Sequence, residues 1–464
     1  MTRKTEVVVI GSGPGGYVAA IRASQLGKKV TIIEKSHIGG VCLNVGCIPS
    51  KALITASEKY HSVQEFETFG LEVENIKFDF EKVQDFKNKT VKRLTDGVQM
   101  LLKANKIELI MGEAKFINNN TLEIMGENDT EELEFEQAII ATGSRPKDIP
   151  AIAFSDRMLS STDLLDMKKI PESLVVIGGG VIGIELANVF ANFGTKVTIL
   201  EGLENILPTI NSKITNVVKK KMVENGIDIY TNARVTSTSI VDNNIQIEAD
   251  IKGENHTFES EYALLSIGRT PNTDTLGLEN TDVTVNDRGL IEVDAQLRTS
   301  QANIFAIGDI VQGAQLAHKA SYEGKVAAEV IAGKKSINDY YVMPSVVFSH
   351  PEIAITGLNV KEAKDKGIQA KSYSFSYGGN GRAIALNETD GMVNLIVEEE
   401  SSKVIGGEIV GHGASDMINE ISLAIESGLT VEDLALTIHP HPTLGEIVME
   451  AAELASGSPI HSVK

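Results

Sequence analysis

The sequence contains only two cysteines in 464 residues, and both lie within one six-residue stretch. Two cysteines are too few for the disulfide framework of a small secreted protein or for a four-thiolate zinc site, so we expect no metal centre. Positive charge is also scarce, because 43 Lys and Arg residues stand against 63 Asp and Glu residues, a formal net charge of -20. Such a surface repels the phosphates of nucleic acids and of anionic lipids, so we expect neither as a partner.

Long apolar runs are missing as well. The longest, Leu174 to Phe190, carries Glu185 and four glycines, which argues against a membrane span. Near the start, Val7 to Ile10 is too short for the apolar region of a secretory signal. The remaining composition, 42% hydrophobic and 23% charged, is typical of globular proteins, and the length suits roughly three domains. We therefore expect a soluble, cytoplasmic protein.

One pattern occurs twice along the chain. Glu6 to Glu34 and Leu174 to Glu201 each read as an apolar strand, a glycine turn, a helix, a second apolar strand and an acidic residue. Each turn has the spacing G-x-G-x-x-G, in which the glycines permit a tight turn, close approach of a pyrophosphate and close helix packing, in that order. The glycines are Gly11, Gly13 and Gly16 in the first unit and Gly178, Gly180 and Gly183 in the second.

The acidic residue that ends each unit indicates the kind of dinucleotide. Glu34 and Glu201 are placed to accept hydrogen bonds from a ribose diol. At Glu201 a carboxylate would repel a 2'-phosphate, and no arginine follows closely, so NAD is favoured over NADP. Chains with two such units commonly pass hydride between two cofactors, so we expect FAD held permanently at one unit and NAD exchanging at the other.

The rest of the chain divides around these units. Ala138 to Gly143 and Asn303 to Asp309 predict strands that return to the first sheet, whereas alternating strands from Tyr341 onward predict a separate domain. We therefore predict one domain from residues 1–147 and 271–340, a second from 148–270 and a third from 341–464. A helix packed on the sheet is also expected, with one apolar stripe formed by Phe80, Val83, Phe86, Val91, Leu94, Val98 and Leu101.

The two cysteines, Cys42 and Cys47, directly follow the first unit. Four intervening residues can form one helical turn, which brings the two sulfurs within disulfide range if the segment bends. The pair could instead be a static staple or two unrelated buried thiols, although cytoplasmic thiols would keep a staple reduced. Histidines could in principle complete a metal site, but two thiolates alone do not make one.

The run from Gly39 to Lys51, GGVCLNVGCIPSK, resembles the redox-active disulfide motif of the pyridine nucleotide-disulfide oxidoreductases. Within that family the likeness is greatest to the dihydrolipoamide dehydrogenases, and it covers essentially the whole chain. Further segments carry the likeness in the family's order: GSGPGG, ATGSRP, GGGVIGIE, SIGRTPN, FAIGD, AHKA and HPHPTLGE. The resemblance implies an α/β fold with two Rossmann-like dinucleotide-binding domains, one for FAD and one for NAD, and a C-terminal α+β dimerisation domain.

The resemblance also implies roles for single residues. Cys42 would be the thiol that meets the substrate, and Cys47 would lie against the flavin and form a thiolate charge-transfer contact. Lys51 would sit near flavin N5 and pair with Glu185, while Asp309 would bind the ribityl chain. The remaining contacts that the resemblance implies are Ala114, Thr142, Gly143, Gln315, Leu316, Ala317 and His318 for FAD, and Val235 and Gly268 for NAD.

A dithiol substrate needs a base that works near neutral pH, and histidine is the natural choice. His441 matches the family's base, with Glu446 as the carboxylate that orients it, whereas His439 is expected to have a supporting or structural role. In this family the base comes from the other subunit of a homodimer, so each active site would need two chains. The chain departs from the family at Gly445, where serine is common, which bears on how rigidly the segment before Glu446 is held.

By this resemblance the chain would oxidise dihydrolipoamide carried by the acyltransferase subunit of a 2-oxo acid dehydrogenase or related complex. Glutathione-type reductases are the nearest alternative, but they usually use NADPH, which Glu201 disfavours. Mercuric reductases and the large thioredoxin reductases carry a C-terminal cysteine pair, which this chain lacks. A non-catalytic flavoprotein sensor or scaffold would need no base, so His441 and Glu446 argue against that class.

Overall fold

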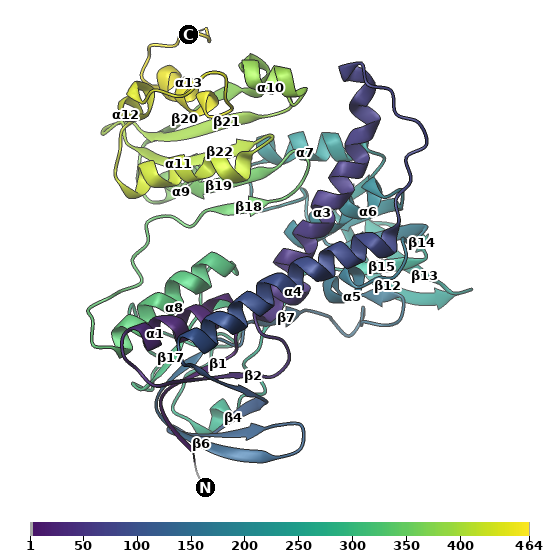
Figure 1. The fold of residues 1–464 in the computed structure, drawn as a ribbon. Coiled ribbons are helices and arrows are strands. Elements are labelled where there is room, and N and C mark those ends of the chain that lie inside the picture. The colour runs from purple at the N-terminus through teal and green to yellow at the C-terminus, as the bar shows by residue number, and fades with distance from the viewer. Residues whose placement is uncertain (1–2, 464) are drawn as a thin grey trace.

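The first α/β unit is a mostly parallel sheet that distant parts of the chain complete (Figure 1). The computed structural model describes residues 3–463. The strands follow the order β3-β2-β1-β6-β5-β4, and β17 pairs with β6 in parallel where the sequence predicted a returning strand. The strands are β1 (Arg3–Ile10), β2 (Val30–Glu34), β3 (Glu108–Met111), β4 (Glu113–Asn118), β5 (Thr121–Met125), β6 (Thr130–Ile140) and β17 (Ile304–Ala306).

Helices α1 (Pro14–Gln25) and α8 (Ala317–Ile331) pack against each other on this sheet (Figure 1). Small residues bring the two helices close, because a Cβ on Gly324 would lie 2.6 Å from the Gly15 carbonyl oxygen. The first unit therefore contains β17 and α8, which lie some 300 residues after β1, as its second half.

The cysteine segment forms two helices with a break between them. Cys42 lies in α2 (Gly40–Val45), and Cys47 begins α3 (Cys47–His61) after Gly46 interrupts the helix. The short η1 (Ser62–Phe69) follows, and the chain then returns along α4 (Phe80–Ala104). The α3 and α4 helices run past both α/β units, so they join the two (Figure 1).

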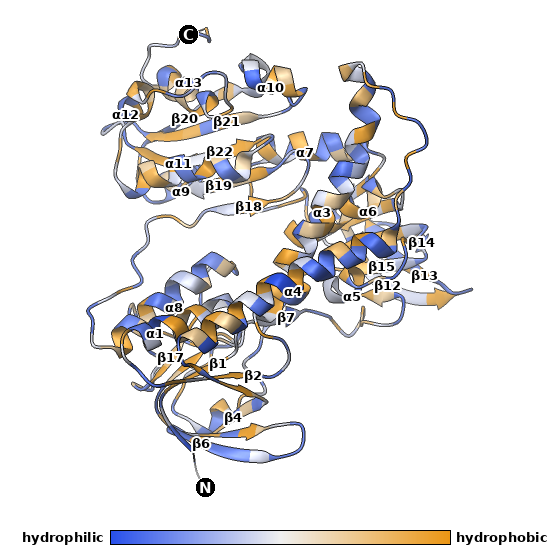
Figure 2. Ribbon diagram, in the orientation of Figure 1, coloured by the Kyte–Doolittle hydropathy of each residue, from blue (hydrophilic) through white to orange (hydrophobic). Residues whose placement is uncertain are grey.

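The predicted apolar stripe on α4 is only partly correct. Phe86, Leu94 and Leu101 are exposed, and Figure 2 shows charged residues beside apolar ones along this helix. The buried residues are Phe80, Gln84, Lys87, Val98 and Leu102. Two of these are polar because α4 also packs on the second unit, where both side chains donate to the Leu165 carbonyl. A stripe read from hydrophobicity alone misses such polar contacts.

The second unit repeats the parallel arrangement, with strand order β11-β10-β9-β15-β8. A separate antiparallel sheet of β12, β13 and β14 packs beside it. The strands are β8 (Met158–Leu159), β9 (Ser173–Ile177), β10 (Lys196–Glu201), β11 (Asp228–Thr231), β12 (Ala233–Val241), β13 (Asn244–Ile251), β14 (Glu254–Ser260) and β15 (Tyr262–Leu265). The helices are α5 (Ser161–Leu165), α6 (Val181–Asn192) and α7 (Ser212–Glu224). A two-stranded ribbon of β7 (Ser144–Pro146) and β16 (Arg269–Pro271) connects this unit with the first.

The C-terminal domain is an antiparallel sheet of order β18-β19-β22-β21-β20, covered by helices (Figure 1). The fold is thus the expected α/β fold with a C-terminal α+β domain. The strands are β18 (Ser345–Val347), β19 (Ile353–Gly357), β20 (Ala370–Ser376), β21 (Met392–Glu398) and β22 (Val404–Val410). The helices are α9 (Val360–Asp365), η4 (Tyr377–Gly379), α10 (Gly381–Leu386), α11 (Ala414–Glu426), α12 (Val431–Leu436) and α13 (Glu446–Ala455). Within residues 3–463, no helix combines the length and apolarity needed to cross a bilayer.

Candidate active site

A cavity of about 940 Å³ lies between the two α/β units. Both glycine turns line it, together with the two cysteines and the ribbon of β7 and β16. From the C-terminal domain, only Ser345 and Val346 contribute to the lining found among the described residues. The two predicted dinucleotide sites and the cysteine pair therefore share one space.

The two glycine turns have the same backbone geometry. Gly11 has φ +97° and Gly178 has φ +105°, in the left-handed region that favours glycine. A Cβ on Gly16 would lie 1.9 Å from the Gly11 carbonyl oxygen, and one on Gly183 would lie 2.1 Å from the Gly178 carbonyl oxygen. The third glycine of each motif thus allows the helix to pack on the turn, and it does not line the cavity.

Both helices that follow the turns begin without a side-chain cap. The N-cap residues are Gly13 for α1 and Gly180 for α6, and a Cβ on either would meet nothing within 4 Å. Uncapped amide N–H groups at the positive end of a helix dipole suit an anionic phosphate. The residues present therefore fit the pyrophosphates of two dinucleotides.

The acidic residues at the ends of β2 and β10 are held in similar ways. Glu34 Oε2 accepts hydrogen bonds from the Ser12 amide (2.9 Å) and hydroxyl (2.7 Å). Glu201 Oε2 accepts from the Gly179 amide at 2.6 Å, and its Oε1 accepts from the Leu203 amide at 2.8 Å. Both carboxylates are buried yet border the cavity, so each is oriented by its own glycine turn.

The two cysteine side chains both line the cavity, where the Cys42 thiol is hydrogen-bonded to the Cys47 sulfur. This hydrogen bond lowers the pKa of Cys47 to about 7; desolvation opposes the shift, and the Lys51 ammonium adds to it. The same contact and burial raise the pKa of Cys42. Both thiols are free in the structure, and the pair releases its first proton near neutral pH.

Lys51 forms the predicted ion pair with Glu185, with Nζ 2.8 Å from Oε2 and 3.1 Å from Oε1. This pair joins α3 of the first unit to α6 of the second. The C-terminal domain contacts it too, because the Phe348 amide donates to Glu185 Oε1 (3.0 Å) and Lys51 Nζ lies 4.5 Å from the centroid of the Phe348 ring. Sequence reasoning missed Phe348, since no spacing in the chain connects it with Lys51.

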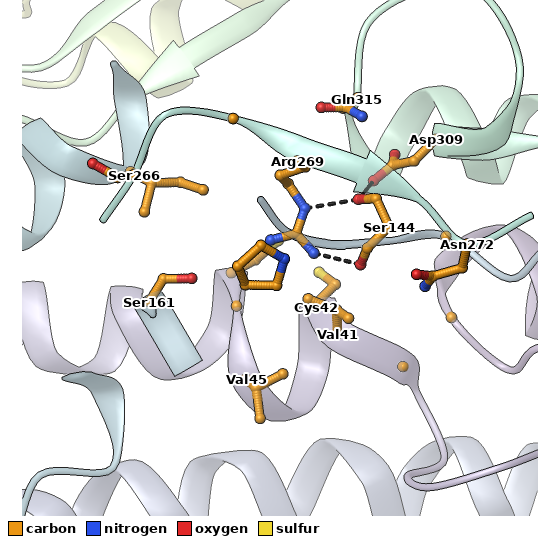
Figure 3. A pocket seen from close by; sticks show the side chains of 18 of the residues that line it. Val41, Cys42, Val45, Ser144, Ser161, Ser266, Arg269, Asn272, Asp309 and Gln315 are labelled. Carbon is orange, nitrogen blue, oxygen red and sulfur yellow. Dashed lines mark hydrogen bonds between the residues drawn. The ribbon is translucent and has the colours of Figure 1, made fainter. Parts of the chain in front are cut away.

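Asp309 lies at the end of a hydrogen-bonded chain that crosses the ribbon (Figure 3). The Ser144 hydroxyl donates to Asp309 Oδ2 at 2.5 Å, and Arg269 Nε donates to the Ser144 Oγ at 2.7 Å. Burial lowers the pKa of Arg269, and the carboxylate of Asp309 opposes that shift. Ser144 and Arg269 also lie in recognised motifs, ATGSRP and SIGRTPN, but only the folded ribbon brings them to Asp309.

His441 and Glu446 form a pair outside this cavity. His441 Nδ1 lies 2.9 Å from Glu446 Oε1, and the Thr443 amide donates to Glu446 Oε2 at 2.8 Å. Burial raises the pKa of Glu446, but the Thr443 amide and the His441 ring outweigh burial and lower it. The His441 side chain is 78% exposed, so its free ring nitrogen faces away from the rest of this chain's core.

His439, by contrast, has both ring nitrogens engaged, with Glu420 Oε1 and the Thr437 carbonyl each at 2.8 Å. Its side chain is nearly buried, which fits a structural role. At Gly445 a Cβ would come no closer than 3.5 Å to another residue, the His439 ring. A serine there would fit in ordinary contact, so the glycine is not needed for space.

Most of the other predicted cofactor residues border the cavity. Those that line it are Ala114, Thr142, Gly143, Val235, Gly268, Gln315, Leu316 and Ala317. His318 does not, because its Nε2 lies 2.7 Å from the Pro344 carbonyl oxygen. The α8 helix begins at Ala317, so the next side chain turns toward the segment that leads into the C-terminal domain.

Comparison with known proteins decides the family. A model of the pyridine nucleotide-disulphide oxidoreductases matches residues 5–324, and the model of that family's dimerisation domain matches residues 343–452. The dihydrolipoyl dehydrogenase of Geobacillus stearothermophilus is 54% identical over 460 residues, which cover 99% of this chain and 98% of that protein. The chain belongs to this family, and within it to the dihydrolipoyl dehydrogenases.

A further relative and two solved structures are similar to the chain over nearly its whole length. The dihydrolipoyl dehydrogenase of Bacillus subtilis is 51% identical over 462 residues, covering 99% of this chain and 98% of its own length. Among solved structures, LpdA of Mycobacterium tuberculosis has a TM-score of 0.91 at 26% identity, covering 97% of this chain and 99% of that chain. The flavoprotein disulfide reductase RclA of Escherichia coli has a TM-score of 0.87 at 29% identity, with coverages of 97% and 99%.

Family membership fixes the chemistry in outline. The chain is a flavoprotein disulfide oxidoreductase, with FAD and NAD(H) as its cofactors and a homodimer as its assembly. The two uncapped helix ends and the two buried carboxylates fit these dinucleotides, as described above. The cysteine pair that shares their cavity fits the redox-active centre of the family.

Proposed function

We propose that the chain oxidises dihydrolipoamide carried by a partner protein to lipoamide and reduces NAD to NADH, as the flavin component of a 2-oxo acid dehydrogenase or related complex. One observation carries the proposal: two neighbouring free thiols border the same cavity as two dinucleotide turns. Electrons can pass between a dithiol–disulfide couple and a nicotinamide couple where such groups share a site.

The dinucleotides are assigned by unit. FAD is held by the first unit through the Gly11 to Gly16 turn, Glu34, Lys51 and Asp309, and NAD by the second through the Gly178 to Gly183 turn and Glu201. When bound, FAD would supply a two-electron acceptor for the reduced thiols and a hydride donor for NAD. The Lys51 ammonium, fixed by Glu185, keeps a positive charge beside this site.

The thiol chemistry is performed by the chain's own residues. A substrate thiol loses its proton to a histidine and attacks Cys42 in the oxidised pair, so a substrate–Cys42 disulfide forms and Cys47 leaves as a thiolate. The second substrate thiol then attacks the sulfur of the substrate in that disulfide, which closes lipoamide and frees Cys42. The Lys51 ammonium lowers the pKa of Cys47 and so favours its departure as a thiolate.

The base is His441 of the partner subunit. Within one chain, the His441–Glu446 pair does not border the cavity that holds the cysteines, and its imidazole is exposed. A homodimer can bring this exposed ring to the other chain's cysteines, so each site takes its thiols from one chain and its base from the other. Glu446 orients the ring and stabilises the imidazolium.

The partner outside the homodimer is a lipoyl-bearing acyltransferase. The net charge of -20 suits a basic docking domain on that partner. We place the enzyme in the cytoplasm, where a cysteine pair is kept free to cycle rather than serve as a staple.

Subunit complementation tests the proposal directly. His441→Gln and Cys42→Ser homodimers should each lose dihydrolipoamide oxidation, whereas a purified heterodimer of the two variants should regain roughly half of the wild-type rate, because one of its two sites is complete. An inactive heterodimer that retains FAD would contradict a base in trans.

Anaerobic reduction identifies the substrate. Dihydrolipoamide should reduce the bound flavin rapidly, and glutathione should not, with NADH preferred over NADPH in the reverse direction. Faster reduction by glutathione, or a preference for NADPH, would instead support a glutathione-type reductase.

A further inference from the structure

Lys319 and Glu323, one turn apart on α8, are two charged groups that the proposed chemistry leaves unused, and they are among the most deeply buried charged side chains of the described residues. Each side chain is 1% exposed, and Lys319 Nζ lies 2.7 Å from Glu323 Oε1. Charged side chains are rarely buried so fully, because removing them from water is costly unless they are paired and hydrogen-bonded. A pair at this depth therefore calls for an account of its remaining contacts.

Those contacts fall on a single residue, Gly308. Glu323 Oε2 accepts a hydrogen bond from the Gly308 amide at 2.7 Å, and Lys319 Nζ donates to the Gly308 carbonyl at 3.2 Å. Gly308 has φ +81°, in the left-handed region, and an added Cβ would lie 3.3 Å from the Ala320 Cβ. The ion pair thus holds both polar groups of the one residue at which the chain turns sharply after β17.

The residue that follows this turn is Asp309. Gly308 and Asp309 begin η3 (Gly308–Ile310), and both border the cavity. The direction of the Asp309 side chain depends on the turn at Gly308. Its carboxylate accepts a hydrogen bond from the Ser144 hydroxyl. A fixed turn therefore places the carboxylate with little freedom.

We infer that the buried Lys319–Glu323 pair is a positioning device that sets Asp309 for the ribityl chain of FAD. The inference rests on the proposed role of Asp309 in holding FAD. It differs from a purely stabilising role, because replacing both members of a buried ion pair with apolar residues is often neutral or stabilising for the fold. Positioning of Gly308 would still be lost in such a variant, since apolar side chains make no hydrogen bonds to it.

The test compares FAD affinity with the stability of the apoprotein. In Lys319→Met/Glu323→Leu, we expect the dissociation constant for FAD to rise about tenfold or more, because two hydrogen bonds from charged groups to the turn are lost. The apoprotein's thermal midpoint should fall by no more than about 4 °C, the shift expected for a small change in stability. The matched control is Lys92→Met/Asp96→Leu, an exposed pair with the same spacing on α4, which should leave both quantities unchanged.

A cycle with Asp309→Ala separates positioning from a general effect. If the pair acts through Asp309, its replacement should weaken FAD binding by less than about twofold in the Asp309→Ala background, since coupled residues are not additive. The inference would be overturned if Lys319→Met/Glu323→Leu bound FAD with wild-type affinity. It would also be overturned if the double replacement caused the same tenfold loss in the Asp309→Ala background as in the wild-type protein. An apoprotein midpoint that falls well beyond the stated limit would also overturn it, in favour of a purely structural pair.

The same preparations distinguish this inference from the proposed function. Wild-type protein that binds FAD but does not oxidise dihydrolipoamide would contradict the proposed function and leave the positioning of Asp309 standing. If the wild-type protein oxidises dihydrolipoamide and Lys319→Met/Glu323→Leu keeps its FAD affinity, the proposed function stands and the positioning of Asp309 by the ion pair is contradicted.

Discussion

The two glycine turns are alike in backbone and differ in what covers them. Both start from a left-handed glycine, end in a glycine that packs against the carbonyl of that first glycine, and lead into an uncapped helix. The first turn is enclosed, because Gly15 packs on Ala320 of α8, and Asp309 and Lys51 line the same part of the molecule. At the second turn, Leu203, which lies two residues after Glu201, is 56% exposed.

We infer that the motif binds a dinucleotide and that the elements around the motif set how readily the dinucleotide is released. A cofactor enclosed by helices and by the cysteine segment is released only when those elements move, whereas an open mouth permits exchange. The same local structure can therefore hold FAD in one unit and turn over NAD in the other.

The largest expected effect comes from adding one methyl group at the tightest point of each turn. Gly16→Ala should give a protein that binds FAD at least about 100-fold more weakly, because relieving a 1.9 Å contact costs on the order of 3 kcal/mol. Gly183→Ala should keep FAD and lose NADH binding by a similar factor. Flavin absorbance and NADH titration measure the two effects, and Gly97→Ala on α4, where a Cβ meets nothing within 4 Å, is the control. Loss of FAD in both variants would break the comparison.

The next effect concerns the two carboxylates. Glu201→Gln should lower kcat/KM for NADH roughly tenfold to 100-fold, because hydrogen bonds to a charged acceptor are lost. It should also reduce the preference for NADH over NADPH. Glu34→Gln should change FAD retention much less, since other elements enclose that site. Steady-state rates with each nicotinamide and flavin content after dialysis test the pair. Equal losses in the two variants would mean that enclosure adds nothing to retention.

The ion pair between the units gives a smaller, pH-dependent effect. The Lys51 ammonium is one of the groups that lower the pKa of Cys47 to about 7, so Lys51→Met should raise that pKa. Because the thiolate forms only as the pH rises through the pKa, a raised pKa moves its formation to higher pH. The fraction of Cys47 present as thiolate at pH 7 should fall by up to about tenfold. Thiolate absorbance of the reduced protein across pH measures the shift. Lys59→Met, an exposed lysine on the same helix, should leave the curve in place.

The smallest effect should come from making the first motif read like the second. Ser12→Gly converts GSG to the GGG of the other unit and removes the hydroxyl that donates to Glu34. The hydroxyl also accepts a hydrogen bond from the Gly39 amide, so the loss of these hydrogen bonds should cost about 1–2 kcal/mol of stability, with FAD still bound. Thermal denaturation with and without added FAD measures it. A protein that releases FAD on dialysis would show that the side chain within the motif, rather than enclosure, separates the two units.

The sequence predicted the local parts of this protein well. Both turns were expected from their glycine motifs, the resemblance to the family implied the Lys51–Glu185 and His441–Glu446 pairs, and the fold class was correct. The apolar stripe on α4 was partly wrong. The reason is that the stripe assumed one packing partner, whereas α4 lies against two units.

Features that act over a few residues follow from the residue types alone: the glycine positions that fix each turn and the acid that ends each unit. Only the tertiary structure decided which distant groups meet, such as Phe348 with Lys51, Arg269 with Ser144, and Lys319 with Gly308. Backbone geometry follows from local sterics, which the residue types specify directly. Contacts between distant segments depend on how whole helices and sheets pack, a sum over many weak interactions that no short motif contains.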